Sequence, residues 1–301
     1  MKKFSKALLI YNGNAGQKDL KKTLSICVSV LAPHLPDLRI LQTEGPGDAK
    51  EYCRQYGETV DVLFILGGDG TVHECINGLA SLQKRPVIGL LPGGTCNDFS
   101  RTLHIPQVLA NAAEAVIHGE IKEIDAAQTG EDYFLNFWGI GLIAETAENI
   151  KDHEKAMLGR VSYFLSAIRT MREMDPFSYH IKTENETIEG QAVMVLILNG
   201  RFIGTQEWLP ASIQADDGLL DIFIIKNTNL AMLREFFSLN TQETIDNDLL
   251  SEVQHHQAQS ISLVTDEKMN ADMDGEVYAS SPAEIAVLPN HFRFLVPAET
   301  P

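Results

Sequence analysis

Short, continuously apolar runs alternate with amphipathic stretches over the first third of the chain. The runs Ala7–Tyr11, Val62–Leu66 and Val87–Leu91 carry hardly any polar residue. This is typical of strands that are covered on both faces of a sheet. Between these runs, apolar positions recur at helical spacing in Lys18–Leu31 and Val72–Leu82. This strand–helix–strand order predicts parallel strands joined by right-handed crossovers.

Four shorter segments continue the same alternation. We expect strands at Leu38–Leu41 and Ile121–Asp125, and helices at Asp48–Tyr56 and Val108–His118. The first part of the chain is therefore predicted to be an α/β domain built on a parallel sheet.

The pattern changes from Tyr133 onward, where apolar runs are longer and helical spacing is rare. The strands expected in this part are Ser178–Thr183, Gly190–Leu198, Leu219–Lys226, Gln259–Val264, Ile285–Leu288 and Phe292–Val296. We expect the last two to pair as a hairpin around Pro289–His291. Helices are expected at Val161–Arg172 and Asn229–Leu239, and the polar stretch Asn240–Gln259 is expected to be the most mobile. Together these features favour a mostly antiparallel, β-rich second domain.

The change of pattern places the domain boundary near Ala126. It gives an α/β domain over residues 1–126 and a β-rich domain over residues 127–301, with the C-terminal tail free to return to the first domain. A chain of 301 residues has room for two such domains, since about 150 residues per domain is an ordinary length.

The charge balance disfavours nucleic acid as a partner. Lys and Arg total 24 and Asp and Glu total 41, so the formal net charge is −17. A protein that binds duplex nucleic acid needs a basic face for the phosphates, so this class is disfavoured.

The longest apolar runs are far shorter than the ~18 residues that a membrane span needs, and no secretory cleavage signal follows the first one. We therefore expect a cytoplasmic protein.

The clearest chemical signal is the glycine-rich loop Gly67–Thr71, which follows an apolar strand and precedes a helix. Its glycines let the backbone approach a ligand closely, and the free N–H groups at the start of the helix attract phosphate. Asp69 inside this loop would repel a phosphate unless a cation lay between them, which suggests a nucleotide bound with Mg²⁺. The alternative is a structural turn in which Asp69 caps the helix.

Two further polar loops follow predicted parallel strands. Pro92–Asp98 offers the hydroxyl of Thr95 and the side chains of Asn97 and Asp98, and Asn12–Gly16 follows the first strand. The carboxyl ends of parallel strands share one edge of a sheet, where open α/β folds bind their ligands. Neither glycine loop has the sequence of a Walker A or GxGxxG motif.

These loops carry a resemblance to a known family. Gly67–Thr71, followed by Glu74 and Asn77-Gly78, resembles the catalytic domain of diacylglycerol kinases. The segment from Pro92 to Phe99 resembles the second nucleotide loop of that family. Asn12 with Gly16 is similar to its first phosphate loop, although Asn14-Ala15 replaces the commoner Pro and Ser.

The resemblance continues through the rest of the chain. Thr43 matches the family's threonine before a Gly-Asp-Ala stretch, and the segments Asp217–Asp221 and Asp274–Glu276 match two later motifs. It extends from about Lys6 to about Val296, and the closest likeness is to the bacterial lipid kinases of this family. The family fold has a nucleotide-binding α/β domain and a β-rich domain, with the active site in the cleft between them.

What the resemblance implies is phosphorylation of a lipid hydroxyl, most readily that of diacylglycerol to give phosphatidic acid, with ATP and Mg²⁺ as cofactors. The nucleotide site would be lined by Asn12, Asn14, Gly16, Thr43, Gly67, Gly68, Asp69, Gly70, Thr71, Glu74, Gly94, Thr95 and Asn97. The resemblance also implies that Asp69 helps to hold the catalytic Mg²⁺, with Asp98 and Asp125 in a nearby network of carboxylates and water.

Asp274 and Glu276 are the candidates for the general base. If the backbone here is extended, residues two apart face the same side. Two carboxylates that share a site raise the pKa of one of them, which suits a base that takes the proton of the lipid hydroxyl. The sequence does not decide between these two carboxylates, and an exposed acidic turn is the alternative interpretation.

A second cation is implied by the resemblance in the β-rich domain. Its ligands would be the side chains of Gln214 and Asp217 and the main-chain oxygen of Leu219. Oxygen-only ligation suits Mg²⁺, but a metal-free turn leading into the next strand explains the same residues.

The lipid substrate implies a transient visit to the inner membrane surface. A chain of charge −17 has no global field that draws it to an anionic bilayer. We therefore expect weak, peripheral contact, with the lipid tail entering an apolar groove in the second domain near Trp138 and Trp208. The oligomeric state is left open, with a homodimer as the expected alternative to a monomer.

Three other functions remain as alternatives. Sphingoid, ceramide or polyprenol kinases share the lipid kinase chemistry. NAD kinases and phosphofructokinases have a similar glycine loop but phosphorylate soluble substrates. A lipid-binding protein on a scaffold that has lost catalysis is the non-enzymatic alternative, although the joint presence of Asp69, Thr95, Asp98, Asp274 and Glu276 disfavours it.

Overall fold

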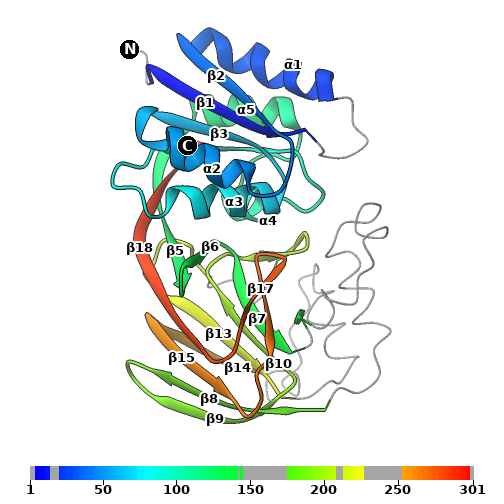
Figure 1. Cartoon of the computed structure of the whole chain (residues 1–301), viewed down its shortest axis with the longest axis vertical. Coiled ribbons are helices and arrows are strands. Elements are labelled where there is room, and N and C mark those ends of the chain that lie inside the picture. Colours follow the sequence, from blue (N-terminus) through cyan, green and yellow to red (C-terminus); the bar gives the residue numbers. More distant parts are fainter. Residues whose placement is uncertain are drawn as a thin grey trace. The chain divides into compact units, whose positions relative to one another are not determined.

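The computed structural model describes residues 4–13, 20–141, 143–144, 175–207, 213–226 and 253–298 (Figure 1). The helices expected at 161–172 and 229–239 lie outside these residues, as do Asn14, Gly16 and Trp208. The chain forms two compact units. Unit 1 comprises Met1–Ile124 and Asn290–Pro301, and unit 2 comprises Asp125–Pro289. The division after Ile124 lies next to the boundary expected near Ala126.

Unit 1 is built on a parallel sheet in the strand order β2-β1-β3-β4-β18. Its four N-terminal strands are β1 (Lys6–Asn12), β2 (Asp37–Thr43), β3 (Val62–Gly67) and β4 (Val87–Pro92). Its helices are α1 (Leu20–Leu31), α2 (Asp48–Tyr56), α3 (Asp69–Leu79), α4 (Asp98–Thr102) and α5 (Leu109–His118), with short 3₁₀ turns η1 (Ala32–His34) and η2 (Gly57–Thr59). The predicted α/β architecture is confirmed.

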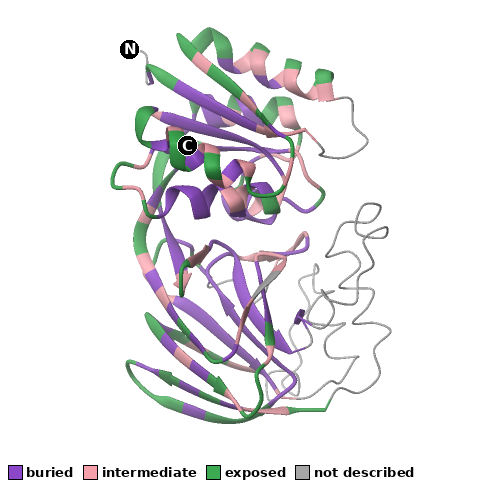
Figure 2. Cartoon of the chain, viewed as in Figure 1, coloured by how far each residue is buried: buried purple, intermediate pink, exposed green. Residues whose placement is uncertain are grey.

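The core of unit 1 lies around its central strands. Every residue of β3 and β4 is buried, as continuously apolar strands require (Figure 2). Helix α2 packs against α3, and α1 packs against α5. A Cβ atom at Gly78 of α3 would lie 2.4 Å from the carbonyl oxygen of Lys50 on α2. Only glycine permits this close approach between the two helices.

Unit 2 contains a six-stranded antiparallel sheet in the order β14-β13-β10-β7-β16-β17, facing a second sheet that includes β15, β8 and β9. Its strands are β6 (Asp132–Phe134), β7 (Phe137–Gly141), β8 (Phe177–Thr183), β9 (Thr187–Ala192), β10 (Met194–Leu198), β11 (Phe202–Ile203), β12 (Gln206–Glu207), β13 (Leu220–Ile225), β14 (Val253–Ala258), β15 (Ser260–Thr265), β16 (Asn270–Met273) and β17 (Glu276–Ser280). One apolar core joins the two sheets, with Trp138, Ile197 and Ile222 among its members. The expected antiparallel, β-rich domain is confirmed.

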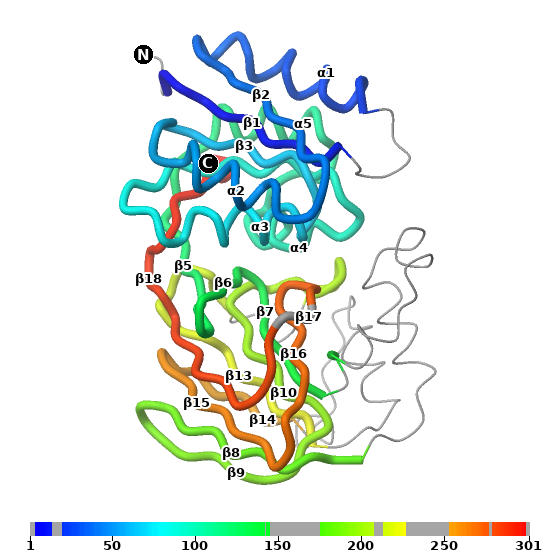
Figure 3. Tube along the Cα trace, viewed as in Figure 1, coloured from blue at the N-terminus to red at the C-terminus, as the bar shows by residue number. Residues whose placement is uncertain are grey.

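Two strands are shared by both units. Strand β5 (Glu120–Thr129) contains the division after Ile124, and β18 (Ala283–Val296) contains the division after Pro289. Figure 3 traces β18 as one continuous segment. Its first part pairs antiparallel with β15, and Arg293 and Phe294 pair in parallel with β4.

The expected hairpin around Pro289–His291 is therefore wrong. Asn290 does adopt a left-handed conformation, with φ 55°, but the strand continues through it. Pro and Asn favour turns because proline lacks an N–H group and asparagine tolerates positive φ. Here they mark the point at which the strand changes partners and not a reversal of the chain.

Candidate active site

The nucleotide loops predicted in unit 1 gather at the carboxyl edge of its sheet. Asn12, Thr43, Gly67 and Pro92 are the last residues of four adjacent parallel strands. Asn12 is directly opposite Thr43, and Gly67 is directly opposite Pro92. The sheet topology thus brings together residues that are up to 80 positions apart, as the sequence predicted.

The two glycine loops contact each other through their backbones. A Cβ atom at Gly94 would lie 2.5 Å from the Cα atom of Gly68, and the N–H of Gly93 donates to the carbonyl of Gly67 at 2.9 Å. The buried side chain of Thr71 covers Gly67, where an added Cβ would lie 2.6 Å from the Thr71 Cβ. At Gly68 and Gly94, backbone packs directly on backbone, which suits close contact with a phosphate chain.

Asp69 joins the two loops. Its carboxylate accepts the main-chain N–H groups of Asn97 at 2.9 Å and Asp98 at 2.7 Å, and so caps the start of α4. Asp69, Cys96 and Asp98 place potential ligand atoms within 4.8 Å of one another. Two carboxylates beside phosphate-binding glycines fit a Mg²⁺ ion. Cys96 was not predicted as a site residue, because the motif match rests on its polar neighbours Thr95 and Asn97.

Asn97 closes the second loop on itself. It adopts a left-handed conformation with φ 53°. Its side-chain oxygen accepts the N–H of Gly94 at 2.8 Å, and its side-chain nitrogen donates to the Gly94 carbonyl at 3.1 Å. Thr95 is exposed at the tip of this closed loop. Asn97 therefore shapes the loop, and Thr95 presents its hydroxyl group to solvent.

Glu74, which was expected to line the nucleotide site, contacts the start of α2. Its carboxylate accepts the N–H groups of Gly47 at 3.0 Å and Ala49 at 3.3 Å, at the start of α2. Asp48 accepts the N–H groups of Glu44 and Gly45, and these bonds lower the pKa of Asp48. The two carboxylates thus hold the loop that follows Thr43 and occupy main-chain donors that could otherwise bind an anion.

Asp125 belongs to unit 2 and contacts the segment predicted to bind the second cation. It is buried, its carboxylate Oδ2 accepts the N–H of Gly218 at 2.7 Å, and its own N–H donates to Ala215 at 2.8 Å. Asp125 was expected to lie in a network of carboxylates and water with Asp69 and Asp98. The described contacts place it beside the Gln214–Leu219 segment.

Negative charge accumulates around that segment. Burial raises the pKa of Asp217, and the nearby carboxylates of Asp221, Asp125 and Asp216 raise it further. Asp221 is completely buried, and its Oδ2 has no hydrogen-bond partner among the described residues. Such crowding favours a bound cation, since a cation would relieve both the repulsion and the unpaired oxygen. The oxygen-rich surroundings of Gln214, Asp217 and Leu219 therefore fit Mg²⁺.

Asp274 is held firmly at the turn between β16 and β17. Its Oδ1 accepts the N–H groups of Asn136 at 2.8 Å and Phe137 at 3.0 Å, and its Oδ2 accepts that of Leu135 at 3.0 Å. Three amides from one segment fix the position of this carboxylate.

The premise of an extended backbone between Asp274 and Glu276 is wrong. Asp274 and Gly275 both have positive φ, 53° and 91°, and form a tight turn. The N–H of Gly275 donates to Asp272 at 2.8 Å and stabilises that turn. Glu276 is the first residue of β17. The glycine is needed for the left-handed turn, so the spacing of two residues does not place both carboxylates on one face of a strand.

His255 and His256 belong to the polar stretch Asn240–Gln259, which was expected to be the most mobile. The Nε2 of His255 instead lies 2.6 Å from the buried Asp221, and the His255 ring stacks on Phe223. His256 lies 2.8 Å from Glu186. Pairing between β13 and β14 places His255 opposite Phe223 and near Asp221, while Glu186 comes from the turn between β8 and β9.

The face of the six-stranded sheet that points away from the core carries apolar side chains together with the buried Asp221, which lies opposite Leu198. Ile197 and Ile222 point into the core between the sheets, so Leu196, Leu198 and Phe223 point to the opposite face, since side chains alternate along a strand. These three side chains are nevertheless fully buried. Trp138 belongs to the core itself and therefore cannot line a groove, contrary to expectation.

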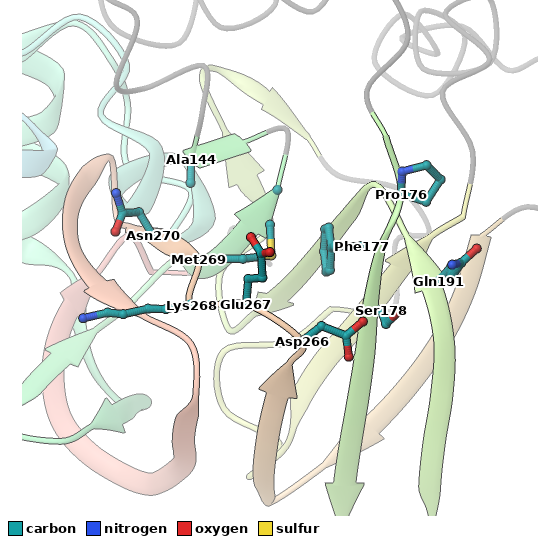
Figure 4. A pocket seen from close by; sticks show the side chains of 11 residues that line it. Ala144, Pro176, Phe177, Ser178, Gln191, Asp266, Glu267, Lys268, Met269 and Asn270 are labelled. Carbon is teal, nitrogen blue, oxygen red and sulfur yellow. The ribbon is translucent and has the colours of Figure 1, made fainter.

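An open cavity of about 630 Å³ lies elsewhere in unit 2. Figure 4 shows its walls, which combine the apolar Phe177 and Met269 with the charged Asp266, Glu267 and Lys268. This mixed lining does not resemble an acyl-chain groove. Among the described residues, no helix is long and apolar enough to cross a membrane.

Comparison with known proteins agrees with this arrangement. A family model described as "Diacylglycerol kinase catalytic domain" matches residues 6–129, and one described as "YegS C-terminal NAD kinase beta sandwich-like domain" matches residues 139–296. A protein of Staphylococcus aureus (strain JH9) that is classed by name as a lipid kinase is 34% identical over 298 residues, which cover 97% of each chain.

Solved structures give the same result. Two crystal structures from Bacillus anthracis str. Sterne, both titled as diacylglycerol kinases, superpose with TM-scores of 0.89 and 0.87. They are 41% and 40% identical to this chain and cover 98% of it, and the match covers 96% and 98% of their own chains. The chain therefore belongs to the family of lipid kinases that combine a diacylglycerol kinase catalytic domain with a YegS-type β-sandwich domain, and it is a kinase.

Proposed function

We propose that this protein transfers the γ-phosphate of Mg-ATP to the hydroxyl group of a membrane lipid, with diacylglycerol as the leading acceptor and phosphatidic acid as the product. The observation that carries the proposal is the junction made by Asp69. This carboxylate ties together two glycine loops whose backbones pack without intervening side chains, and it lies close to Asp98. Such an arrangement supports a phosphate chain that is bound together with its cation.

Unit 1 would hold the nucleotide. The two glycine loops would lie against the phosphates, and the exposed Thr95 would offer them its hydroxyl group. Asp69 and Asp98 would ligate Mg²⁺, which would neutralise the charge of the transferring phosphoryl group. Phosphoryl transfer depends mainly on positioning and charge neutralisation, so these groups suffice for the nucleotide half of the reaction.

Unit 2 would supply the base and the lipid site. Asp274 or Glu276 would accept the proton of the lipid hydroxyl as it attacks the γ-phosphate. The fixed position of Asp274 suits this role, because a general base must be held within hydrogen-bond reach of the proton. The buried apolar side chains of Leu196, Leu198 and Phe223 mark the candidate region for the lipid tail. Contact with the membrane would be peripheral and brief, and a homodimer is compatible with this function.

The test is a comparison of phosphate acceptors. ATP consumption and product formation are measured with diacylglycerol, ceramide and polyprenol in mixed micelles, and with NAD⁺ and fructose 6-phosphate in solution. Phosphorylation of diacylglycerol that requires Mg²⁺ is the expected result. Preference for ceramide or polyprenol would change the acceptor and keep the lipid kinase chemistry. Activity with a soluble acceptor alone would contradict the proposal, as would lipid binding without turnover.

A further inference from the structure

Asn199 contacts the far side of the segment that holds Asp274. The peptide group between Leu135 and Asn136 uses both of its polar atoms. Its carbonyl accepts the side-chain amide of Asn199 at 2.7 Å, and its N–H donates to Asp274 Oδ1 at 2.8 Å. A chain of two hydrogen bonds thus runs from the Asn199 side chain, through one peptide group, to the carboxylate.

The next peptide group repeats this arrangement. The carbonyl of Asn136 accepts the main-chain N–H groups of Asn199 and Gly200, both at 2.9 Å. The N–H of Phe137, in the same peptide group, donates to Asp274 Oδ1 at 3.0 Å. Donation to a carbonyl polarises the peptide and strengthens the bond that its N–H makes, so both chains reinforce the hold on one carboxylate oxygen.

The orientation of the Asn199 amide is fixed, and it leaves one polar atom unpaired. Its nitrogen donates to the carbonyls of Leu135 and of Asp125, the second at 3.3 Å, so exchanging nitrogen and oxygen would lose both bonds. Its Oδ1 is buried and has no partner among the described residues. A buried acceptor without a donor destabilises a fold and calls for an explanation.

Gly200 permits the close packing that this network needs. A Cβ atom at position 200 would lie 2.3 Å from Oδ1 and 3.0 Å from Cα of Asn136. Any larger residue would displace the Asn136 peptide, whose carbonyl and whose neighbouring N–H groups form the network.

We propose that Asn199 is a positioning residue, which orients the 135–137 segment and through it fixes the carboxylate of Asp274. Its side-chain nitrogen also ties that segment to the carbonyl of Asp125, so two acidic residues from distant parts of the chain share one anchor. The inference rests on the proposed function only where it gives Asp274 a part in the reaction.

The first test does not depend on activity. In hydrogen exchange, the amides of Asn136 and Phe137 are expected to be protected in the full-length protein. Asn199→Leu keeps the shape of the side chain and removes its donor, and we expect the exchange of these two amides to become at least ten times faster. Gly200→Ala should have the same effect by displacing Asn136, and it tests the network if the first variant folds poorly.

The matched control is Thr183→Ala. Thr183 is also buried in unit 2, where its hydroxyl bonds, among the described residues, to the neighbouring Asn185 and Glu186. The Thr183→Ala variant should have a lower melting temperature but unchanged hydrogen exchange at the amides of Asn136 and Phe137. Unchanged protection in folded Asn199→Leu and Gly200→Ala would overturn the inference.

The second test separates kcat from KM. Asn199→Leu should lower kcat about 10²-fold and leave the KM for ATP within twofold, because a misplaced reacting group costs turnover and the nucleotide loops lie in unit 1. Thr183→Ala should keep the wild-type kcat. A normal kcat together with lost amide protection would remove Asn199 from the reaction. A wild-type protein without lipid kinase activity would refute the proposed function, while hydrogen exchange would still decide whether Asn199 positions Asp274.

Discussion

The two units assemble their polar groups in different ways. In unit 1, Asp69 and Asn97 bond within and between loops that directly follow parallel strands. In unit 2, Asp125 and Asp274 accept main-chain N–H groups from segments that are far away in the sequence. The carboxyl ends of parallel strands share one edge of a sheet, whereas the acidic groups of unit 2 are positioned by contacts between segments that are distant in sequence. A local motif can therefore encode the first arrangement but not the second.

The largest expected effect follows from removing the junction of unit 1. Asp69→Asn keeps the size of the side chain but loses one acceptor oxygen and the charge beside Asp98. We expect kcat to fall about 10³-fold, the upper range for losing one preorganised electrostatic group, and Mg²⁺-dependent ATP binding to weaken. Steady-state kinetics and ATP titrations with and without Mg²⁺ measure both effects. Turnover close to that of the wild type would refute the role of Asp69.

The corresponding test in unit 2 separates its two candidate bases. Glu276→Gln and Asp274→Asn remove basicity, and at least one should lower kcat by about 10²-fold or more with little change in ATP affinity. Asp274→Asn also faces three N–H donors with only one oxygen, so it should lower the melting temperature as well. Each kcat is therefore compared at a temperature at which the variant is fully folded. If both variants stay within a few-fold of the wild type, the base is a different group.

The backbone contact between the glycine loops is tested by Gly94→Ala. The new methyl group would lie 2.5 Å from the Cα atom of Gly68, so one loop has to move. We expect a loss of about 1–3 kcal/mol in the free energy of unfolding, as for overpacking elsewhere, together with weaker ATP binding. Gly45→Ala is the matched control, since its Cβ would meet nothing within 4 Å. Equal effects of the two substitutions in urea unfolding would argue against a tight contact between the loops.

The smallest effect concerns the carboxylates around Asp217. The raised pKa of Asp217 means that protonation favours the folded state, so its contribution to stability is present at low pH and is lost as pH rises through the folded pKa. Asp217→Asn should therefore raise the melting temperature slightly at pH 7 in EDTA. Mg²⁺ should stabilise the wild type, by about 2.7 kcal/mol at one hundred times its Kd, and should stabilise the variant much less. Equal gains from Mg²⁺ in both proteins would exclude Asp217 as a ligand.

Unit 1 could be predicted from sequence in most respects. Its buried strands are continuously apolar, and its loops carry glycines where close approach requires them, as at Gly68 and Gly94. The contact of Glu74 with the start of α2 was not predictable, because it depends on how two helices pack. Local composition identifies which residues lie near the site but not what each one bonds to.

Unit 2 was less predictable, for physical reasons. Strand β14 has the polar sequence VQHHQA and gave no strand signal, since its burial depends on partners such as Asp221. Asn199 carries no recognisable motif either. Its proposed role depends on Leu135, which it bonds directly, and on Asp274, which it reaches through the 135–137 segment. These residues lie about 64 and 75 positions away in the sequence. The change of strand partner at Asn290 was not predicted for the same reason. Pro and Asn favour a turn, but they do not specify which strand the chain pairs with next.

Strand β18 has a consequence for how the protein is made. The edge of β4 is covered by Arg293 and Phe294, which follow unit 2 in the sequence and are therefore translated after it. While unit 2 is being synthesised, one edge of β4 would therefore be unpaired. Every residue of β4 is buried in the folded protein, and an exposed apolar strand edge favours aggregation. A fragment that stops near residue 126 would keep that open edge permanently. Recombinant production of unit 1 alone would require residues 290–298 to be supplied as well.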